Sequence, residues 1–557
     1  MMKNTILSVL FTFALLLTAS ANDSIFVQLK SGKVLAYEYG ENDTVSVNEK
    51  VIAIADTIFY SEAVSRITFD RSILKQESGT QFVSFKLRGN EDINTCLLGK
   101  TFTADINDLA TADTIKFTIP YLTSFKLKPF FVANSQKTKV YIDDTEIISE
   151  ESEVDFSKPV EMRLEYPGSK PRKYIVTVKN SGLPIVKINT PKGGIINSKT
   201  TWIEQSTMVI YEADGTVNYD SGNDYMNIRG RGNSTWSYSK KPYNIKLNTK
   251  KSILGMPKHK RWCLLANYID RTLMRNAVAF ELAKMTSMDW TPNGRFVELV
   301  LNGQPAGNYY LCEAIRIDKN RVNINEMSPN DISGDAITGG YILELDSYYD
   351  AEWKFKTTYY RMPVNVKQPD DNEMNSQQHS YIKNYYNAAE KELYNGSLEG
   401  FAKYVDLNSL IDWYLLNEAI YNPELKHPKS SYMYKDKNGK LFMGPAWDHD
   451  WETFTPHSSL KNADTMWFAA LFKIPEFKQM VKERWNKLKG PFTGVASFIE
   501  ETRKEIRTSW EYNYTIWPTI SNSVNGDISL GYDAAVNRLK NSFLDRVRSL
   551  NTIINAW

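Results

Sequence analysis

The first 182 residues place hydrophobic and polar side chains in near alternation over short runs. Residues 24–30, 64–69 and 82–87 are examples, and Gly, Asn and Asp interrupt the sequence between such runs. A period of two is the pattern of a β-strand with one buried face, and these interruptions are typical of hairpins. Because no long helical pattern follows, we expect a short β-rich module over residues 22–74 and an immunoglobulin-like β-sandwich over residues 75–182.

The pattern changes near residues 181–184, where strand patterns begin to alternate with helical ones. Between residues 271 and 283, apolar side chains recur with the period of an amphipathic helix, and Asp270 is its expected N-cap. An Asn-Gly pair between two strand-like runs predicts a hairpin over residues 432–443. The other expected elements are helices at 407–419, 474–488 and 532–556 and a strand pair at 296–301 and 307–313. Residues 184–557 are thus predicted to form one α+β domain.

The chain begins with a basic residue and a short apolar run. Lys3 precedes an apolar stretch from Ile6 to Leu17, and small residues follow as far as Ala21. These are the parts of a secretory signal peptide, and the stretch is shorter than the ~20 residues that a membrane-spanning helix needs. We predict a signal peptide over residues 1–21, cleaved near Ala21. The mature chain is then exported (periplasmic, on the cell surface or secreted) and has no transmembrane segment; a retained anchor helix is the alternative.

Composition narrows the class of function. The 557 residues include 67 Lys and Arg and 65 Asp and Glu, a formal net charge of +2, and this even balance argues against a nucleic-acid partner. The sequence has no HExxH or CxxC motif, which disfavours a zinc site. Of the three cysteines, Cys263 and Cys312 lie in apolar, strand-like surroundings, so we expect buried free thiols.

A glycine-rich turn at residues 229–235 is the first candidate site. Its sequence, RGRGNST, precedes a predicted strand that carries Lys240, Lys241 and Lys246. Glycine lets backbone N–H groups approach an anion closely, and basic side chains neutralise phosphate charge. The turn lacks the GxxxxGK[ST] pattern of a P-loop, so a tight turn with solvated basic side chains is the alternative. Which lysine would face a cleft stays open, because neighbours on a strand point to opposite faces.

Acidic residues between positions 422 and 450 form the second candidate site. Asp448 and Asp450 follow a strand-like run, and if that strand continued, both carboxylates would lie on one face. A hard divalent cation such as Mg²⁺ would relieve their repulsion, whereas a capped turn with solvated acids is the alternative. Asn422 and Glu424, on a polar loop after the helix at 407–419, could bind a second metal or orient a hydroxyl group.

Taken in order, these motifs resemble the CotH family of spore-coat-type protein kinases, a divergent branch of the kinase fold. The shared order is RxRGN[ST][ST], a Lys-rich strand, WxLxxNxxDxxxxRN, NGxxxGxYxxxE, Nx[DE] and WDxD. The matching residues are Arg229 to Thr235, Lys241, Trp262, Asn267, Asp270, Arg275, Asn276, Asn302, Gly303, Gly307, Tyr309, Glu313, Asn422, Glu424 and Trp447 to Asp450. The expected architecture is therefore multidomain, with all-β modules preceding an α+β, kinase-like domain. The leading modules resemble those of exported proteins from Bacteroides-like bacteria.

The resemblance implies Mg²⁺-dependent transfer of the ATP γ-phosphate to a Ser or Thr hydroxyl of a partner protein. The residues that it assigns to the nucleotide are Arg229, Arg231, Asn233, Ser234, Lys241 and Glu313. It assigns Asp448, Asp450 and Asn422 to the metal, and Asp448, Asn422 and Glu424 to catalysis. Glu424 stands where the family has an Asp that accepts the substrate proton, and Glu is one methylene longer.

Two other functions stay open on the sequence. One is a non-catalytic surface or binding protein with a kinase-like domain, whose 13% aromatic content suits a carbohydrate or protein ligand. The other is a glycan hydrolase that uses Asp448 and Asp450 as its carboxylate pair. Such a pair must flank the scissile bond from opposite sides, which neighbours on one strand face do poorly.

Overall fold

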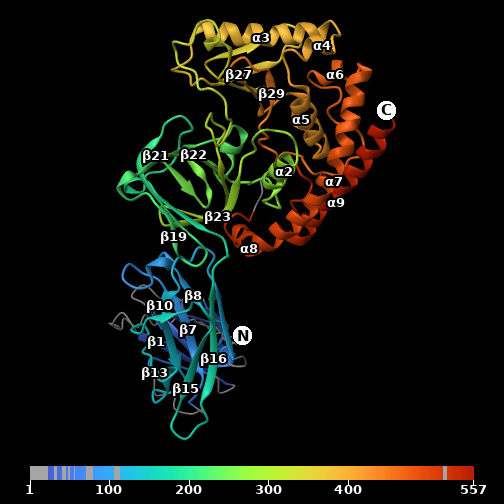
Figure 1. Ribbon diagram of the computed structural model, residues 1–557. Helices are drawn as coiled ribbons and strands as arrows, with labels where there is room; N and C mark the ends of the chain where they lie inside the picture. The colour runs from blue at the N-terminus through green and yellow to red at the C-terminus, as the bar shows by residue number, and fades with distance from the viewer. Residues whose placement is uncertain are drawn as a thin grey trace, which may run out of the picture. The chain divides into compact units, whose positions relative to one another are not determined.

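The computed structural model describes residues 23–30, 34–39, 45–47, 51–54, 57–70, 79–105, 109, 113–518 and 524–557. The chain divides into two compact units, Met1–Asn180 and Ser181–Trp557 (Figure 1). The predicted signal peptide at residues 1–21 lies outside the described residues. Within the described ranges, we find no helix with the length and apolar content needed to cross a bilayer.

The first unit consists mainly of short β-strands, as the alternating pattern predicts. Its sheets have the strand orders β2-β1-β6, β3-β4-β5, β11-β7-β8 and β13-β12-β15-β16-β9, with a further pair β10-β14. The strands are β1 Asp23–Leu29, β2 Val34–Tyr39, β3 Val45–Val47, β4 Val51–Ile54, β5 Thr57–Tyr60, β6 Val64–Thr68, β7 Phe82–Arg88, β8 Thr101–Thr103, β9 Thr114–Thr118, β10 Lys126–Leu127, β11 Pro129–Ala133, β12 Lys139–Ile142, β13 Thr145–Glu146, β14 Val154–Asp155, β15 Val160–Glu165 and β16 Arg172–Lys179. The chain therefore begins with β-sheet modules, while the immunoglobulin-like sandwich and the module boundary near residue 74 stay predictions.

The second unit opens with a large sheet that closes on itself. Its strand order is β17-β23-β24-β22-β21-β20-β18-β19, and β17 also pairs with β18, so the strands from β17 to β18 form a ring. The strands are β17 Ile185–Asn189, β18 Ile203–Tyr211, β19 Val217–Asp220, β20 Met226–Gly230, β21 Tyr243–Ile253, β22 Met256–Leu265, β23 Gly294–Leu301 and β24 Gln304–Glu313. Trp262, Ile228 and Ile245 belong to the apolar cluster that fills the ring, so the alternate residues of these strands point outward.

A smaller antiparallel sheet and most of the helices form the rest of this unit. The sheet has the order β26-β27-β25-β28-β29, with β25 Tyr341–Leu345, β26 Lys354–Lys356, β27 Pro363–Gln368, β28 Ser431–Lys435 and β29 Leu441–Met443. The helices are α2 Arg275–Lys284, α3 Ser376–Tyr394, α4 Leu398–Phe401, α5 Leu407–Ala419, α6 Phe468–Leu471, α7 Pro475–Glu505, α8 Arg507–Ile516 and α9 Tyr532–Asn555. Figure 1 shows α7 and α9 running side by side along one flank. The unit is thus the mixed α+β structure that the sequence predicts.

Three predicted elements need correction. The helix predicted at 474–488 continues to Glu505, as α7. The helix α2 begins at Arg275 rather than at residue 271, because Leu273 has a left-handed backbone with φ of 63°, which no α-helix accommodates. Asp270 caps the preceding turn instead, and its carboxylate accepts hydrogen bonds from the backbone N–H groups of Thr272 and Arg275 at 2.9 and 2.8 Å. The strand before Asp448 ends at Met443, so the two aspartates do not share one strand face.

Arg275 is a buried cation that joins three separate segments. Its guanidinium pairs with Asp270 and, at 2.7 Å, with Asp527. Its Nε also donates a hydrogen bond to the carbonyl oxygen of Thr453 at 3.1 Å. The three charged side chains are at most 2% exposed. Water therefore does not stabilise these charges, and each is stabilised by the opposite charge beside it.

We expect Arg275→Met to lower the free energy of unfolding of the second unit by about 3–5 kcal/mol, because it leaves two buried carboxylates without a cation. Chemical denaturation of the full chain measures this change. Arg507→Met is the matched control, since Arg507 pairs with Asp533 where the two side chains are 41% and 56% exposed, and we expect a loss below about 1 kcal/mol. Equal losses in the two variants would contradict the role given to Arg275.

Candidate active site

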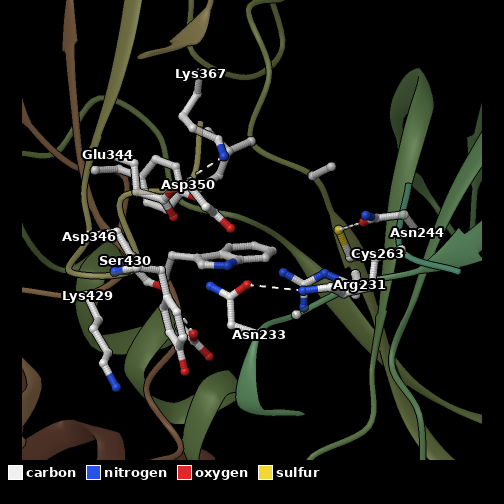
Figure 2. A pocket seen from close by; sticks show the side chains of 18 of the residues that line it. Arg231, Asn233, Asn244, Cys263, Glu344, Asp346, Asp350, Lys367, Lys429 and Ser430 are labelled. Atoms are coloured by element: carbon white, nitrogen blue, oxygen red, sulfur yellow. Dashed lines mark hydrogen bonds and ion pairs between the residues drawn. The ribbon is translucent and has the colours of Figure 1, made fainter. Parts of the chain in front are cut away.

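A cavity of about 510 Å³ lies between the two sheets of the second unit (Figure 2). Strands β20, β21 and β22 line it on one side, through Arg229, Asn244 and Cys263. The second sheet lines it through Glu344 on β25 and Tyr432 on β28. The glycine-rich turn at residues 229–235 borders the same cavity, which also reaches Glu424 and Asp448. Stretches that are far apart in the sequence therefore meet at one site.

The walls of this cavity carry opposite charges. Figure 2 shows Arg231 on one side and the acids Glu344 and Asp346 on the other. Among the acids, Glu344 pairs with Lys367 at 3.2 Å, and Glu424 lies 3.9 Å from Lys429. The cationic side chains that line the cavity are Lys199, Arg229, Arg231, Arg316, Lys367 and Lys429. Such walls suit a ligand that brings both anionic groups and a cation.

The loop that carries Asp448 and Asp450 is held by buried hydrogen bonds. The backbone N–H of His449 donates to the side-chain oxygen of Asn276 at 2.7 Å. The side-chain amide of Asn525 donates to the carbonyl oxygen of Asp450 at 3.0 Å. Asp448 has a left-handed backbone, with φ of 63°, and lines both the large cavity and a neighbouring one of about 40 Å³, which Asp450 also lines. The loop, rather than a strand, brings the two carboxylates together.

The acidic groups at this end of the cavity disfavour one another's ionisation. Burial raises the pKa of Asp448, although Arg231 and a hydrogen bond from the Ser430 hydroxyl at 3.1 Å oppose the rise. Burial and then the charge of Asp448 raise the pKa of Asp450. Burial followed by the charges of Asp448 and Asp450 raises the pKa of Glu424. A cation between these groups would relieve the repulsion.

These carboxylates fit a magnesium ion that arrives with a phosphate ligand. Across the part of the chain that the structure describes, no group of three or more His, Cys, Asp or Glu side chains is arranged as a complete metal site. Mg²⁺ in nucleotide sites characteristically takes one or two carboxylates and completes its shell with phosphate oxygens and water. Asp448 and Asp450 can supply those carboxylates, and the adjacent cavity leaves room for the other ligands.

Glu424 lines the cavity, whereas Asn422 lies behind it. The Asn422 side-chain oxygen accepts a hydrogen bond from the Glu424 backbone N–H at 3.0 Å, as the N-cap of a short 3₁₀ helix, Pro423–Lys426. Its side-chain nitrogen donates to the side-chain oxygen of Asn417 at 2.9 Å. Both ends of the amide are thus engaged, one by the loop and one by α5. This geometry makes Asn422 a positioning residue for Glu424 rather than a group that faces the ligand.

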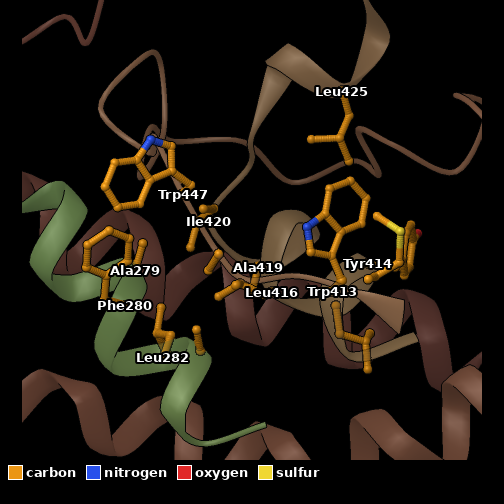
Figure 3. Packing of buried hydrophobic residues seen from close by; sticks show 14 of the residues in the cluster. Ala279, Phe280, Leu282, Trp413, Tyr414, Leu416, Ala419, Ile420, Leu425 and Trp447 are labelled. Atoms are coloured by element: carbon orange, nitrogen blue, oxygen red, sulfur yellow. The ribbon is translucent and has the colours of Figure 1, made fainter. Parts of the chain in front are cut away.

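The residues next to Glu424 and Asp448 are anchored in one apolar core. Leu425 and Trp447 pack with the side chains of α2 and α5, as Figure 3 shows. Trp447 stacks on Phe280 with ring centroids 5.8 Å apart. The guanidinium of Arg231 lies 5.2 Å from the centroid of the Trp447 ring. The tryptophan therefore links the core to the charged surface of the cavity.

The predicted nucleotide residues fall into two groups. Arg229, Arg231, Asn233 and Ser234 line the cavity. In this group, the Arg229 guanidinium donates to the Thr200 carbonyl oxygen at 3.0 Å and stacks over Trp202, and the Asn233 side-chain oxygen accepts from Lys199 at 3.4 Å.

Lys241 and Glu313 lie away from the residues that line the cavity. The Lys241 Nζ donates to the Trp236 carbonyl oxygen at 2.6 Å. Glu313 accepts hydrogen bonds from the backbone and side chain of Asn293, both at 3.0 Å, and lies 3.8 Å from Arg321. Lys240 is also turned inward, since its Nζ donates to the Ala266 carbonyl oxygen at 2.8 Å. The lysines of the predicted strand thus do not line the cavity, whereas Arg229 and Arg231 of the turn do.

Sequence reasoning missed the acidic wall formed by β25. Glu344 and Asp346 follow a run of apolar residues in the order acid, apolar, acid. This is the same spacing that drew attention to Asp448 and Asp450. The signal was therefore present, but the segment lay in a stretch for which no strand had been predicted.

Comparison with protein families places this site within a known group. Residues 228–550 match the family described as CotH kinase protein, and the matched range contains the glycine-rich turn, Glu424 and the aspartate loop. A comparison with curated proteins finds no match. A kinase family implies a kinase-like protein that uses ATP. Because the matched range covers more than half of the 557 residues, the chain belongs to the CotH kinase family.

Proposed function

We propose that this protein is a Mg²⁺-dependent protein kinase that transfers the ATP γ-phosphate to a Ser or Thr hydroxyl of another protein. The observation on which the proposal rests is that Arg231, Glu424 and Asp448 line one cavity although they come from three distant stretches. Phosphoryl transfer depends on positioning and on charge stabilisation more than on covalent help from the protein. A cavity with a basic side, an acidic side and a fixed loop supports that chemistry.

In this proposal Asp448, helped by Asp450, would hold Mg²⁺, and the ion would neutralise charge on the phosphates. Arg231 supplies a positive charge on the opposite wall, and its contact with Trp447 restricts the directions in which its guanidinium can point. Arg229 extends the basic wall along β20. The two walls would thus hold the ligand from opposite sides, and Glu424 lines the same cavity.

Glu424 is the group that we propose to accept the proton of the acceptor hydroxyl. Its carboxyl holds a proton more tightly than a free Glu because of burial and of the nearby aspartates. A cation bound by Asp448 and Asp450 would reverse the second effect, and Lys429 at 3.9 Å acts in the same direction. The base would thus become effective only once the acidic end of the cavity holds its cation.

Export of the mature chain is a further proposal, and it rests on the pattern of residues 1–21. An exported kinase of this kind would phosphorylate proteins outside the cytosol. The β-sheet modules of the first unit are the part of the chain that we propose for docking to a protein or carbohydrate surface.

Asp448→Asn should lower phosphate transfer at least about 100-fold, because it removes the charge that holds the metal while keeping the size of the side chain. The assay follows radiolabel from γ-labelled ATP into a mixture of exported proteins and into the chain itself. Asp545→Asn is the control, since Asp545 is 64% exposed on α9, and it should transfer at the wild-type rate. If wild type and Asp448→Asn label equally, the metal assignment is wrong. If neither transfers label but both bind ATP, a non-catalytic binding protein is favoured.

Glu424→Gln should reduce kcat by about 100-fold or more while leaving ATP binding within about twofold of wild type, because the amide cannot accept the hydroxyl proton. Glu424→Asp should reduce kcat by about tenfold, since the backbone is fixed by Asn422 and the carboxylate would retreat by one methylene. A rise in kcat for Glu424→Asp would mean that the longer side chain is a handicap in this protein. Single-turnover kinetics measures the rate of phosphate transfer separately from the affinity for ATP.

Arg231→Met should weaken Mg-ATP binding roughly tenfold or more, because it removes a cation from the cavity wall. Lys241→Met should change binding by less than about threefold, since its Nζ is engaged with the Trp236 carbonyl oxygen outside the cavity. Isothermal titration calorimetry of the full chain measures both. A larger loss of affinity in Lys241→Met than in Arg231→Met would show that Lys241 turns toward the nucleotide when the nucleotide binds.

A further inference from the structure

Two free cysteines face each other on adjacent strands beside the cavity. Cys263 on β22 and Cys312 on β24 are direct partners in the antiparallel register. Opposed residues in such a pair have Cα atoms about 4.5–5.5 Å apart. Disulfide-linked cysteines have Cα atoms about 4.4–6.8 Å apart. The sheet therefore presents the two thiols at a spacing that a disulfide can bridge.

Close contacts surround both cysteine side chains. The Cys263 Sγ donates a hydrogen bond to the side-chain oxygen of Asn244 at 3.3 Å. On its other side, Cys312 faces Gly294 of β23 across the sheet. A Cβ at position 294 would lie 2.9 Å from the Cβ of Cys312, so the glycine leaves room for the buried thiol.

The two thiols differ in access and in charge. Cys263 lines the 510 Å³ cavity near Arg231, as Figure 2 shows, whereas Cys312 is fully buried. The neighbouring Cys312 thiol and then the positive charge of Arg231 lower the pKa of Cys263 to about 6, although burial opposes the shift. Burial and then the neighbouring Cys263 raise the pKa of Cys312. One thiol thus lines the cavity, and the other lies directly behind it.

We propose that Cys263 and Cys312 are a redox-active dithiol, oxidised to a disulfide by a small-molecule disulfide that enters through the cavity. The Cys263 thiolate attacks one sulfur of the reagent, so that a mixed disulfide forms and one thiolate leaves. The Cys312 thiol then loses its proton and attacks the Cys263 sulfur, which expels the second thiolate. The two cysteines lose two electrons and two protons in total, and the reagent leaves as two thiols.

This dithiol site does not depend on the proposed phosphoryl transfer, but the two share a wall. A nucleotide bound in the cavity would cover Cys263, so occupancy should slow the first step. The resulting disulfide would tie β22 to β24 and remove the thiolate next to Arg231. Oxidation is therefore expected to alter nucleotide binding as well.

The test treats the full chain with oxidised glutathione and measures its mass and its cross-linked peptides. We expect wild type to lose two hydrogens and to give one peptide pair that joins Cys263 to Cys312. Cys312→Ser should stop at a mixed disulfide on Cys263. Cys263→Ser should slow the reaction at least about tenfold, because the reactive thiolate is gone. Cys96→Ser is the matched control and should form the same cross-link as wild type.

Absence of the cross-link in wild type, with the chain folded by circular dichroism, would overturn the proposal. A cross-link that includes Cys96 would overturn it too. A final arm adds saturating Mg-ATP before the reagent. Protection of Cys263 supports a nucleotide in this cavity, whereas cross-linking at the unprotected rate would leave the dithiol in place and count against the proposed ATP site.

Discussion

The geometry of the candidate site depends on one buried ion cluster, Arg275 with Asp270 and Asp527. Burying three charges is costly, and a well-packed apolar cluster could match or exceed its contribution to stability. The cluster instead fixes the relative positions of its partners, because a guanidinium offers several N–H donors at fixed angles. One of these donors reaches the carbonyl oxygen of Thr453, a few residues after the aspartate loop. The start of α2, the loop and a segment near the chain's end are thereby fixed to a common point.

Around this cluster, buried apolar residues fix the backbone, and charged residues next to them line the cavity. Trp447 and Leu425 are buried in the core, while their neighbours Asp448 and Glu424 line the cavity. The core thus sets the position of the carboxylates without touching them. Burial and the nearby acidic groups raise the pKa values of Glu424 and Asp450, and a bound cation would lower them again.

Much of this could be predicted from the sequence, and the failures have physical reasons. The helix at 407–419 was found at its full length because its apolar residues are regular and Asp406 caps it. The helix α3 was missed because its sequence is polar and rich in Tyr, although Asn375 and Gln378 form a capping box that signals its start. Closure of the large sheet of the second unit depends on the pairing of β17 with β23, which are far apart in the sequence, so no local pattern reveals it.

For the site, motif order located the turn, Glu424 and the aspartates, but it did not give side-chain direction. Lys241 lies on the predicted strand, yet its amine turns to a backbone carbonyl, and Asn422 caps a turn where a metal ligand was expected. These contacts join residues at most five positions apart, but they depend on how the backbone turns there, which the order of the motifs does not specify. Asn267 and Asn276 are hydrogen-bonded to each other at 3.1 Å, a relation that their separate places in a motif did not indicate.

Asn525 and Asp527 lie close to the carboxyl end of the sequence, yet they complete the surroundings of Asp450 and Arg275. During synthesis, the loop is translated long before the partners that fix it. A nascent chain that has emerged only as far as α8 therefore contains every proposed catalytic residue but lacks the contacts that hold the aspartate loop. The buried contacts of the aspartate loop are thus complete only once residues 525–527 have been made and have folded onto it, and a chain that lacked them would carry an unfinished centre.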